Sequence, residues 1–422
     1  MVGRPLGRPS HSNTTRGRLT LSGRPLGRPS QLILLLYKIL PIPSSQCCIF
    51  RIPQSLRILS EEAYIPNIVS IGPLHHDKEC VKAMDEHKKW YLHSILHRTP
   101  KPDNTLKDFL KTIQAMEVQI RASYSKPIDL SSDDFVEMIL LDSYDNYPIY
   151  ITSWMLSSLK HDIILLENQL PFFALQHLFD MIRDSDNDLF LEEYVQYFFR
   201  DVYPQKTNHL LDLLRNHFFQ CSGEMEAGDY RFGDHLIESA TELANAGMQF
   251  VPEHYAGSLL DITFNKNGVF RIPLFFLADT VSYLLGNLIA LEQCDNDYDS
   301  TLSSYIILLD SLINTPRDVR LLRREAILDS FLRDDEQVFR IIKRLGKGVI
   351  VSKFHFAKLC RQVNAYYESD WRKWPRANLK RNYVYTLKRD YFNTPWAFIS
   401  FVAATMLLLL TLVQTLFTVH TR

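Results

Sequence analysis

Six side chains that can bind a metal or carry a proton fall close together early in the sequence: His75, His76, Cys80, His87, His93 and His97. His93 and His97 stand one helical turn apart, a spacing at which two imidazoles can chelate one ion with help from His75 or Cys80. The spacing matches no closed metal site, however, and Trp90 fits an ordinary amphipathic helix with polar histidines at its edge. A metal site and an amphipathic helix therefore both stay open.

A second candidate is the triplet Glu167-Asn168-Gln169, which lies between the apolar runs IILL and LPFF. Polar side chains buried without partners cost about 1–3 kcal/mol each, so these three must find partners or water. A carboxylate in such a place can have a raised pKa and act as a general acid. Alternatively, the triplet forms a corner between two helices and satisfies free backbone groups before Pro171 starts the next helix.

A third group of residues is basic and aromatic. Between Trp371 and Asp390, Trp and Tyr residues alternate with cations, which are Arg372, Lys373, Arg376, Lys380, Arg381, Lys388 and Arg389. By itself this pattern indicates a patch for nucleic acid. Because an apolar segment follows, we interpret it instead as a juxtamembrane segment attracted to anionic lipid, and we expect no nucleic acid among the partners.

The signatures of common enzymes are missing from the sequence. It has no G-x-x-x-x-G-K-[ST], G-x-G-x-x-G, G-x-S-x-G or H-E-x-x-H motif. Asp184, Asp186 and Asp188 begin like a calcium loop, but Leu189 and Val195 stand where such a loop needs Gly and Glu. We therefore predict a protein that is not an enzyme and holds no cofactor. The alternative is an enzyme with an unfamiliar active site, centred on Glu167 or on the His75–His97 cluster.

The elements that position these residues are predicted to be mainly helices. Glycine is scarce, with 15 in 422 residues, and apolar residues recur at helical spacing in segments such as Leu106–Ser123. Ser131, Ser239 and Thr315 are expected to cap helix starts. A small β-hairpin is expected where LLDITF and VFRIP flank Asn265–Gly268, because Asn-Gly supplies the positive φ angles that a tight turn needs.

Composition divides the chain into three parts. Residues 1–45 carry two GRPLGRPS repeats and are predicted to be a disordered basic tail, with an organelle transit peptide or a signal peptide as alternatives. Residues 46–392 are predicted to form one large helical domain with a variable region at about 184–234. Its cysteines include no C-x-x-C pair, which suits a reducing compartment. Residues 393–422 are predicted to be a membrane anchor.

The anchor prediction rests on Trp396 to Val419, which include Leu407 and Leu410 and contain no charged residue. As a helix this segment spans about 36 Å, enough to cross a hydrocarbon core of ~30 Å. Several cations precede this segment, and Arg422 is the one Lys or Arg after it. Because cations favour the cytosolic side of a membrane helix, we expect the body of the protein in the cytosol. We thus predict a mainly α chain: a large helical domain with a small β-hairpin element, plus one C-terminal transmembrane helix, in the plasma membrane. Small and polar residues in this helix allow self-association.

Ten ordered pieces of the sequence resemble the plant domain-of-unknown-function 247 family from about residue 47 to 417. They read CCIFRIPQSLR, AYIPNIVSIGPLHH, MDEHKKWYL, FVEMILLD, IILLENQLPFF, SATELANAG, LLDITF, NLIALEQC, SLINTPRDV and NTPWAFIS…QTLF. The resemblance implies a plant protein with a C-terminal membrane helix, and it brings no catalytic residues. Asp77 departs from the family pattern, which usually has Gly there, and Ser143-Tyr144 replaces the usual Gly-Cys.

Some grass members of that family are implicated in self-incompatibility, which implies a recognition or signalling role. We therefore expect a single-pass membrane-anchored plant protein that acts by protein–protein interaction. Its expected partners are membrane lipid and another protein.

Overall fold

The computed structural model describes most of residues 46–370, together with 406–407 and 410–411. The gaps within 46–370 are 58–60, 99–101, 144–152, 183–190, 192–206, 220–227, 230–235, 255–256, 296 and 352. The predicted tail at 1–45, the basic residues of 372–389 and most of the predicted variable region lie outside the described residues.

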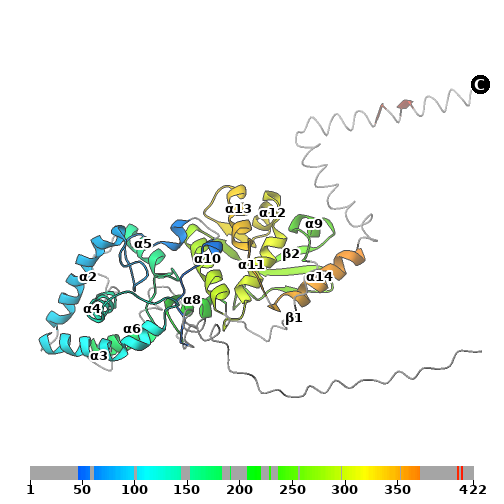
Figure 1. Cartoon of the computed structure of the whole chain (residues 1–422). Helices are drawn as coiled ribbons and strands as arrows, with labels where there is room; N and C mark the ends of the chain where they lie inside the picture. The colour runs from blue at the N-terminus through cyan, green and yellow to red at the C-terminus, as the bar shows by residue number, and fades with distance from the viewer. Residues whose placement is uncertain are drawn as a thin grey trace, which may run out of the picture. The chain divides into compact units, whose positions relative to one another are not determined.

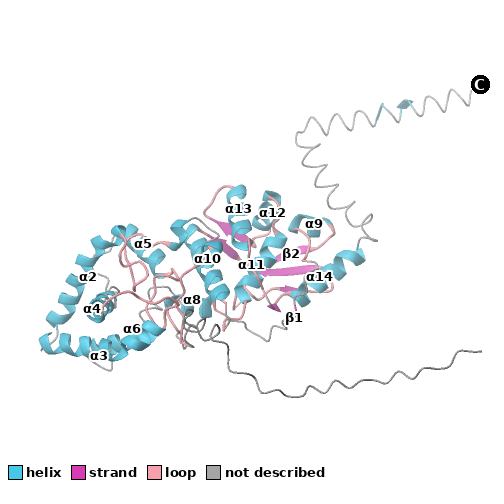
Figure 2. Cartoon of the chain, viewed as in Figure 1, coloured by secondary structure: helices cyan, strands magenta, loops and turns pink. Residues whose placement is uncertain are grey.

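Helices make up most of the described chain (Figures 1 and 2). Two short 3-10 helices, η1 (Gln54–Leu56) and η2 (Glu61–Tyr64), come first. The α-helices of the first half are α2 (Glu79–Arg98), α3 (Pro102–Ala122), α4 (Ser132–Asp142), α5 (Ser153–Ile163), α6 (Phe172–Ile182) and α8 (Leu210–Phe218). Those of the second half are α9 (Ala240–Asn245), α10 (Asp279–Cys294), α11 (Thr301–Leu312), α12 (Pro316–Arg324), α13 (Asp335–Gly346) and α14 (Ala357–Asp370).

The described strands are short and form three small sheets. They are β1 (Gly228–Asp229), β2 (Gln249–Glu253), β3 (Thr263–Phe264), β4 (Val269–Pro273), β5 (Phe275–Leu277), β6 (Leu328–Ser330) and β7 (Lys353–Phe354). The central sheet has the order β2-β4-β3, in which β2 runs parallel and β3 antiparallel to β4. β5 pairs in parallel with β6, and β1 pairs antiparallel with β7.

The predicted hairpin is present as β3 and β4. Gly268 ends its turn with a φ of 79°, and a Cβ at this position would collide with the ring of Tyr366. Glycine is therefore required here by both backbone conformation and space. The parallel partners of β4 and β5 were not predicted, because nothing in two short apolar runs specifies which distant strand will pair with them.

The predicted helix starts are also confirmed. Ser131 and Ser239 accept hydrogen bonds from the third backbone N–H of α4 and of α9, respectively. Thr315 precedes α12, where Asp318 Oδ2 accepts from the Thr315 N–H at 2.8 Å and from its hydroxyl at 2.9 Å. Asp318 Oδ1 accepts from the N–H of Thr241, so the same carboxylate joins α12 to α9.

Apolar side chains form two hydrophobic cores. The N-terminal core includes Phe109, Ile113, Phe135 and Ile139 and is built mainly by α2–α6 and α8. The C-terminal core is built mainly by α9–α14 and the strands, with Tyr305 among its fully buried side chains. Helix α10 contacts η2, α5 and α8 as well as α11 and α13, so it packs against elements of both groups (Figure 1).

One prediction about the fold is wrong. Among the described residues, no helix is both long enough and apolar enough to cross a membrane. The two longest described helices, α2 and α3, carry charged residues along their length and pack one face on the N-terminal core. The structure therefore corrects the expectation of a C-terminal transmembrane helix, and with it the expected single-pass location in the plasma membrane.

Only part of the predicted anchor is described. Leu407 and Leu410 lie in short helical stretches and are more than half exposed, at 64% and 61%. Trp396 and Val419 lie outside the described residues, as do the juxtamembrane cations.

Candidate functional site

The polar triplet at 167–169 lies in the turn between α5 and α6, and all three side chains are buried. Asn168 Oδ1 accepts a hydrogen bond from the N–H of Ile71 at 2.7 Å. Its Nδ2 donates to the carbonyls of Val69 and Asp162 at 3.0 and 2.9 Å. All of the hydrogen bonds described for Asn168 thus go to backbone groups, two of which belong to a segment about 100 residues earlier in the chain.

The side chain of Gln169 also forms hydrogen bonds with backbone groups. Its Nε2 donates to the carbonyls of Ile163 and Leu165 at 2.6 and 2.8 Å, at the end of α5. Its Oε1 accepts from the N–H of Leu211, in the first turn of α8, at 3.2 Å. The structure therefore supports the interpretation of this triplet as a corner between helices whose side chains satisfy free backbone groups.

Glu167 is held as an anion. Its Oε1 accepts from the N–H of Ile52 at 2.8 Å and from Arg57 Nη2 at 2.7 Å, and its Oε2 lies 3.1 Å from His75 Nε2. Burial by itself would raise the pKa of Glu167. The interactions with His75, Arg57 and the Ile52 N–H outweigh burial and hold this pKa below its ordinary value. A carboxyl group with a lowered pKa is a poor general acid at neutral pH, so the geometry does not favour the catalytic interpretation.

The histidine cluster is divided between separate places. His75 is buried beside Glu167, which joins two candidates that the sequence analysis treated separately. His93 and His97 stack on α2 with ring centroids 5.9 Å apart, and Cys80 is exposed. In the part of the chain that the structure describes, no group of three or more His, Cys, Asp or Glu side chains is placed to hold a metal ion.

Asp162, the next-to-last residue of α5, organises the loop that follows η2. Its Oδ1 accepts from the N–H of Asn67 at 2.7 Å, and its Oδ2 accepts from those of Ile68 and Val69 at 2.8 and 2.9 Å. These N–H groups belong to no strand, so one buried carboxylate replaces the partner that a neighbouring strand would supply.

A buried ion pair holds the other end of this loop. Lys88 Nζ donates to Asp142 Oδ1 and to the carbonyl of Ser70, both at 2.6 Å, and Asp142 Oδ2 accepts from the N–H of Gly72 at 2.7 Å. Gly72 has a φ of 78°, and a Cβ there would lie 2.6 Å from the Gln169 carbonyl oxygen. We name residues 67–72 the latched loop, because buried side chains fix its backbone from both ends.

Helix α10 supplies a further contact near this loop and joins it to the rest of the fold. Asn287 is fully buried; its Nδ2 donates to the carbonyl of Ala63 at 2.9 Å, and its Oδ1 accepts from the N–H of Leu166 at 3.0 Å. This one amide therefore connects η2 and the corner after α5 to the same helix.

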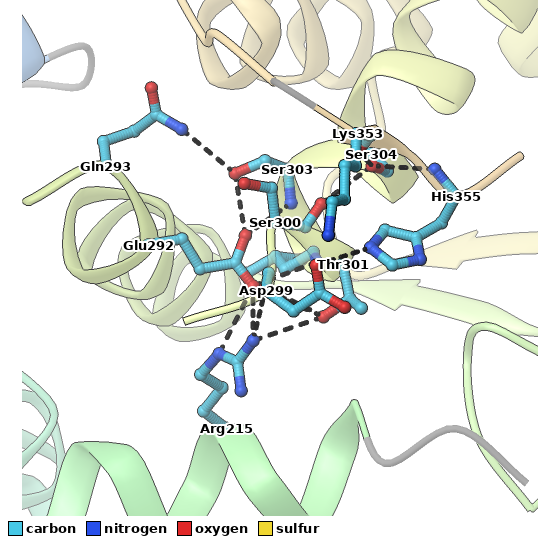
Figure 3. A network of polar contacts seen from close by, with 11 residues as sticks. Arg215, Glu292, Gln293, Asp299, Ser300, Thr301, Ser303, Ser304, Lys353 and His355 are labelled. Atoms are coloured by element: carbon cyan, nitrogen blue, oxygen red, sulfur yellow. Dashed lines mark hydrogen bonds and ion pairs between the residues drawn. The ribbon is translucent and has the colours of Figure 1, made fainter. Parts of the chain in front are cut away.

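Five residues further along α10, Glu292 forms a second network (Figure 3). Its carboxylate accepts from Arg215 of α8 at 3.0 Å and from the N–H groups of Leu302 and Ser303 at 3.1 and 2.8 Å. The N-terminus of α11 is thus capped by a side chain from α10, and the guanidinium balances the buried charge. The two polar residues fix α10 relative to both cores.

Between these fixed parts lies a cleft of about 360 Å³ at the N-terminus of α10. It is lined by the latched loop, α5, α10 and the segment after β6, through Asn67, Ser157, Ser158, His161, Ala278, Asp279, Thr280, Tyr283, Phe331 and Leu332. Because Tyr283 packs against both hydrophobic cores, the cleft lies where the two cores meet. Such junctions are common places for binding sites.

His161 is the buried polar side chain of this cleft. Its Nδ1 lies 2.9 Å from Asp162 Oδ1 and 3.0 Å from Asn67 Nδ2, and its ring packs edge-on against Tyr283. The carboxylate can only accept hydrogen bonds and the Asn67 amide nitrogen can only donate them, so in either tautomer Nδ1 bonds to one of the two.

Exposed aromatic side chains surround the cleft. Phe331, which lines it, is 82% exposed, and its ring meets that of Phe276 with centroids 4.9 Å apart. Trp154 is 63% exposed and lies one turn before Ser157 and Ser158 in α5. Aromatic side chains are enriched at interfaces relative to the rest of a protein surface.

A second, larger concavity of about 510 Å³ lies among α2, α3 and α4. His93, one of the predicted metal ligands, lines it together with leucines such as Leu92, Leu96 and Leu110. Its lining is chiefly aliphatic and it lacks the buried, oriented polar group that His161 gives to the cleft.

No sequence pattern singled out Asn67, His161, Asp162 or Phe331. A signal for Asp162 existed: an acid at the end of an apolar helical run needs partners, and the extended run IPNIVSIG needs acceptors for its N–H groups. Nothing in the sequence marked Phe331, because exposure of one aromatic residue depends on packing that composition does not show.

Comparison with known proteins places the chain in a class. It matches a family of plant proteins of unknown function over residues 49–410, which is most of its length. The chain therefore belongs to the plant domain-of-unknown-function 247 family, as its sequence pieces predicted.

The chain is similar to two Arabidopsis thaliana proteins. It is 28% identical to UPF0481 protein At3g47200 over 418 residues, which cover 87% of this chain and 85% of that protein. It is 23% identical to Putative UPF0481 protein At3g02645 over 483 residues, covering 87% and 89%. No solved structure matches the chain.

Proposed function

We propose that this chain is a recognition protein, without enzymatic activity, that acts by binding another protein through the face that carries the cleft at Tyr283. The observation that carries the proposal is the pair Phe276 and Phe331, stacked edge to face at the rim of a polar cleft with Phe331 82% exposed. Aromatic anchors beside oriented polar groups are the usual composition of a protein-binding hot spot.

The rigidity of the surroundings supports this proposal. Buried side chains fix the latched loop, and Asn287 and Glu292 fix α10, so the cleft is lined by backbone that is already ordered before binding. A preformed site loses less conformational entropy when a partner docks, which favours affinity. The polar triplet at 167–169 contributes to this order and carries no chemistry of its own.

The proposal is tested by comparing partners captured by full-length variants expressed in plant tissue. Phe331→Ser should reduce capture of the specific partner by about 30-fold or more, because loss of a central aromatic anchor costs ~2 kcal/mol or more. Val118→Ser is the matched control: Val118 is 83% exposed on α3, away from the cleft, so capture should be unchanged.

The control separates loss of the interface from loss of solubility or expression. If Phe331→Ser and the double variant with Trp154→Ser both retain every partner that the wild-type chain captures, this face is not the interface and the proposal is wrong.

A further inference from the structure

Three helices that build the N-terminal core form a groove away from the cleft. Helices α2, α3 and α4 each contact the other two (Figure 1), and the concavity of about 510 Å³ lies among them. In the described part of the chain, this concavity and the cleft at Tyr283 share no lining residue. We name it the leucine groove, after five residues that line it: Leu92, Leu96, Leu106, Leu110 and Leu141.

The leucines of the groove are only half-buried. Two come from α2, two from α3 and one from α4, and those of α2 and α3 pack against the N-terminal core. The rest of their surface lies in the groove, in contact with solvent, although burial of apolar surface is favourable. A contiguous apolar surface of this kind, rimmed by polar residues, is a mark of an interaction site.

The length of the groove matches one side of a helix. Its lining residues run from Lys89 to Leu96 on α2 and from Asp133 to Leu141 on α4. At about 1.5 Å per residue these stretches are ~10–12 Å long. Residues i and i+7 of a docked helix lie ~10 Å apart, so a single apolar stripe at i, i+4 and i+7 covers the groove. Helices that bind in apolar grooves use this spacing of anchors.

The two edges of the groove differ in charge. On the α4 side, Asp133 and Glu137 are exposed, stand one turn apart and have no ion-pair or hydrogen-bond partner among the described residues. Asp133 lies in the first turn of α4 and complements its dipole, but Glu137 lies beyond that turn. On the α2 side, Lys89 Nζ already lies 3.2 Å from Glu86 Oε1. The groove therefore offers uncompensated negative charge along α4.

We propose that the leucine groove binds an amphipathic helix of a partner protein, with apolar anchors at i, i+4 and i+7 and two cations four residues apart on one flank. The anchors cover the leucines. The cations meet Asp133 and Glu137, which have the same spacing on α4. A fatty acid would also cover the leucines, but its carboxylate would be repelled by these two acids. The inference goes beyond the proposed function, because it assigns a second docking surface with its own partner chemistry.

The test measures binding of a designed peptide to the full-length chain by fluorescence anisotropy. The probe is an alanine-based helix of about 18 residues with leucines at i, i+4 and i+7 and two lysines four residues apart on one flank. In a second peptide, glutamates replace the two lysines. We expect a dissociation constant on the order of 10 µM for the lysine peptide and about tenfold weaker binding of the glutamate peptide. The difference should shrink at high salt, because exposed charges are screened.

Reversal of one charge in the groove tests the assignment directly. Glu137→Lys should weaken binding of the lysine peptide about tenfold and strengthen that of the glutamate peptide several-fold, because attraction and repulsion are exchanged. Glu79→Lys is the matched control, with the same change in net charge. The Glu79 side chain is 86% exposed at the start of α2, outside the groove, so this variant should change either affinity by less than about twofold.

A change in the apolar lining should act on both peptides alike. Leu110→Ser removes part of the surface that the leucine anchors cover, so it should weaken binding of the two peptides by the same factor of about fivefold. Circular dichroism of each variant verifies that it folds.

Equal binding of the two peptides to the wild-type chain, or an unchanged preference in Glu137→Lys, would overturn the inference. Failure of the lysine peptide to bind at about 1 mM would do the same. Analytical ultracentrifugation examines the other occupant that the groove could take. A wild-type dimer that becomes monomeric in Glu137→Lys would mean that a second copy of the chain fills the groove, and the proposal of a partner helix would be wrong.

Discussion

The two halves of the molecule satisfy their backbone polar groups in different ways. In the half around the N-terminal core, the latched loop has no partner strand, and buried side chains such as Asp162, Asn168 and Asp142 bond its N–H and carbonyl groups. In the half around the C-terminal core, the strands pair within separate sheets, β2-β4-β3 and β5-β6. Buried carboxylates there, such as Glu292 and Asp318, accept from backbone N–H groups at helix starts. The first half therefore uses side chains to bond an extended segment, whereas the second bonds its extended segments by strand pairing.

The largest expected effect tests the dependence of the first half on charge. Lys88→Met leaves the Asp142 carboxylate buried without its cation, so the free energy of unfolding should fall by about 3–5 kcal/mol. Urea unfolding of the full chain measures this. Lys89→Met is the matched control, because Lys89 is exposed in the same helix and pairs only weakly with Glu86, and it should change stability by less than ~0.5 kcal/mol.

A similar loss of unfolding free energy, with a different physical cause, is expected in the second half. Leu308 is fully buried in α11, and Leu308→Ala should cost about 3 kcal/mol through lost burial and the cavity that remains. Unlike the loss in Lys88→Met, this one should not vary between pH 5 and pH 8, because no titratable partner is left unpaired. A pH-dependent loss in Leu308→Ala would contradict the division between the two halves.

A smaller loss of stability is expected in the first half when the pH is lowered. Burial lowers the pKa of His75, despite Glu167 beside it, so below its ordinary value of 6.5 the unfolded chain takes up this proton before the folded chain does. The contribution is complete above about pH 6.5 and is lost as the pH falls toward the lowered value. The loss is at most about 1.4 kcal/mol per pH unit.

Comparison of His75→Gln with the wild-type chain isolates the contribution of His75 to stability. Unfolding free energies measured from pH 7.5 to 5 should fall less steeply for the variant. Glu167, whose pKa is also lowered, adds a loss only in more acid solution, below its ordinary value of 4.5. Parallel curves for both proteins would show that His75 does not titrate on unfolding.

The smallest effect should be equal in the two halves. Ser131 caps α4 and Ser239 caps α9 with the same geometry, so Ser131→Ala and Ser239→Ala should each cost about 1 kcal/mol. Thermal unfolding of each variant measures this. A large difference between them would mean that one helix start is held by its surroundings instead of its cap.

Local features of the fold were predictable because residues close in sequence determine them. Asn265–Gly268 determines a turn, and Thr315 with Asp318 determines a helix start, regardless of the rest of the chain. The latched loop was not predictable in this way, since Asp162 meets Asn67 across 95 residues of sequence. The site itself was missed for the same reason: it combines Asn67, His161 and Phe331, which only tertiary packing brings together.

The predicted membrane helix was inferred from the lack of charge in Trp396–Val419, which is a property of composition alone. In the part of the chain that the structure describes, no helix is long and apolar enough to cross a membrane. The triplet at 167–169 shows the opposite case. Its sequence position between apolar runs suggested two roles, and the partners of Asn168 and Gln169 decided for one of them.

The way in which the latched loop is held has a consequence for hydrogen exchange. Amide protons of irregular segments normally exchange quickly with solvent, because their N–H groups face water. Those of Ile68, Val69, Ile71 and Gly72 instead donate to buried side chains, so they should exchange as slowly as amides within a helix. Slow exchange in this segment would report the opening of α5 and α4 from the loop, and would time that event without any probe on the helices themselves.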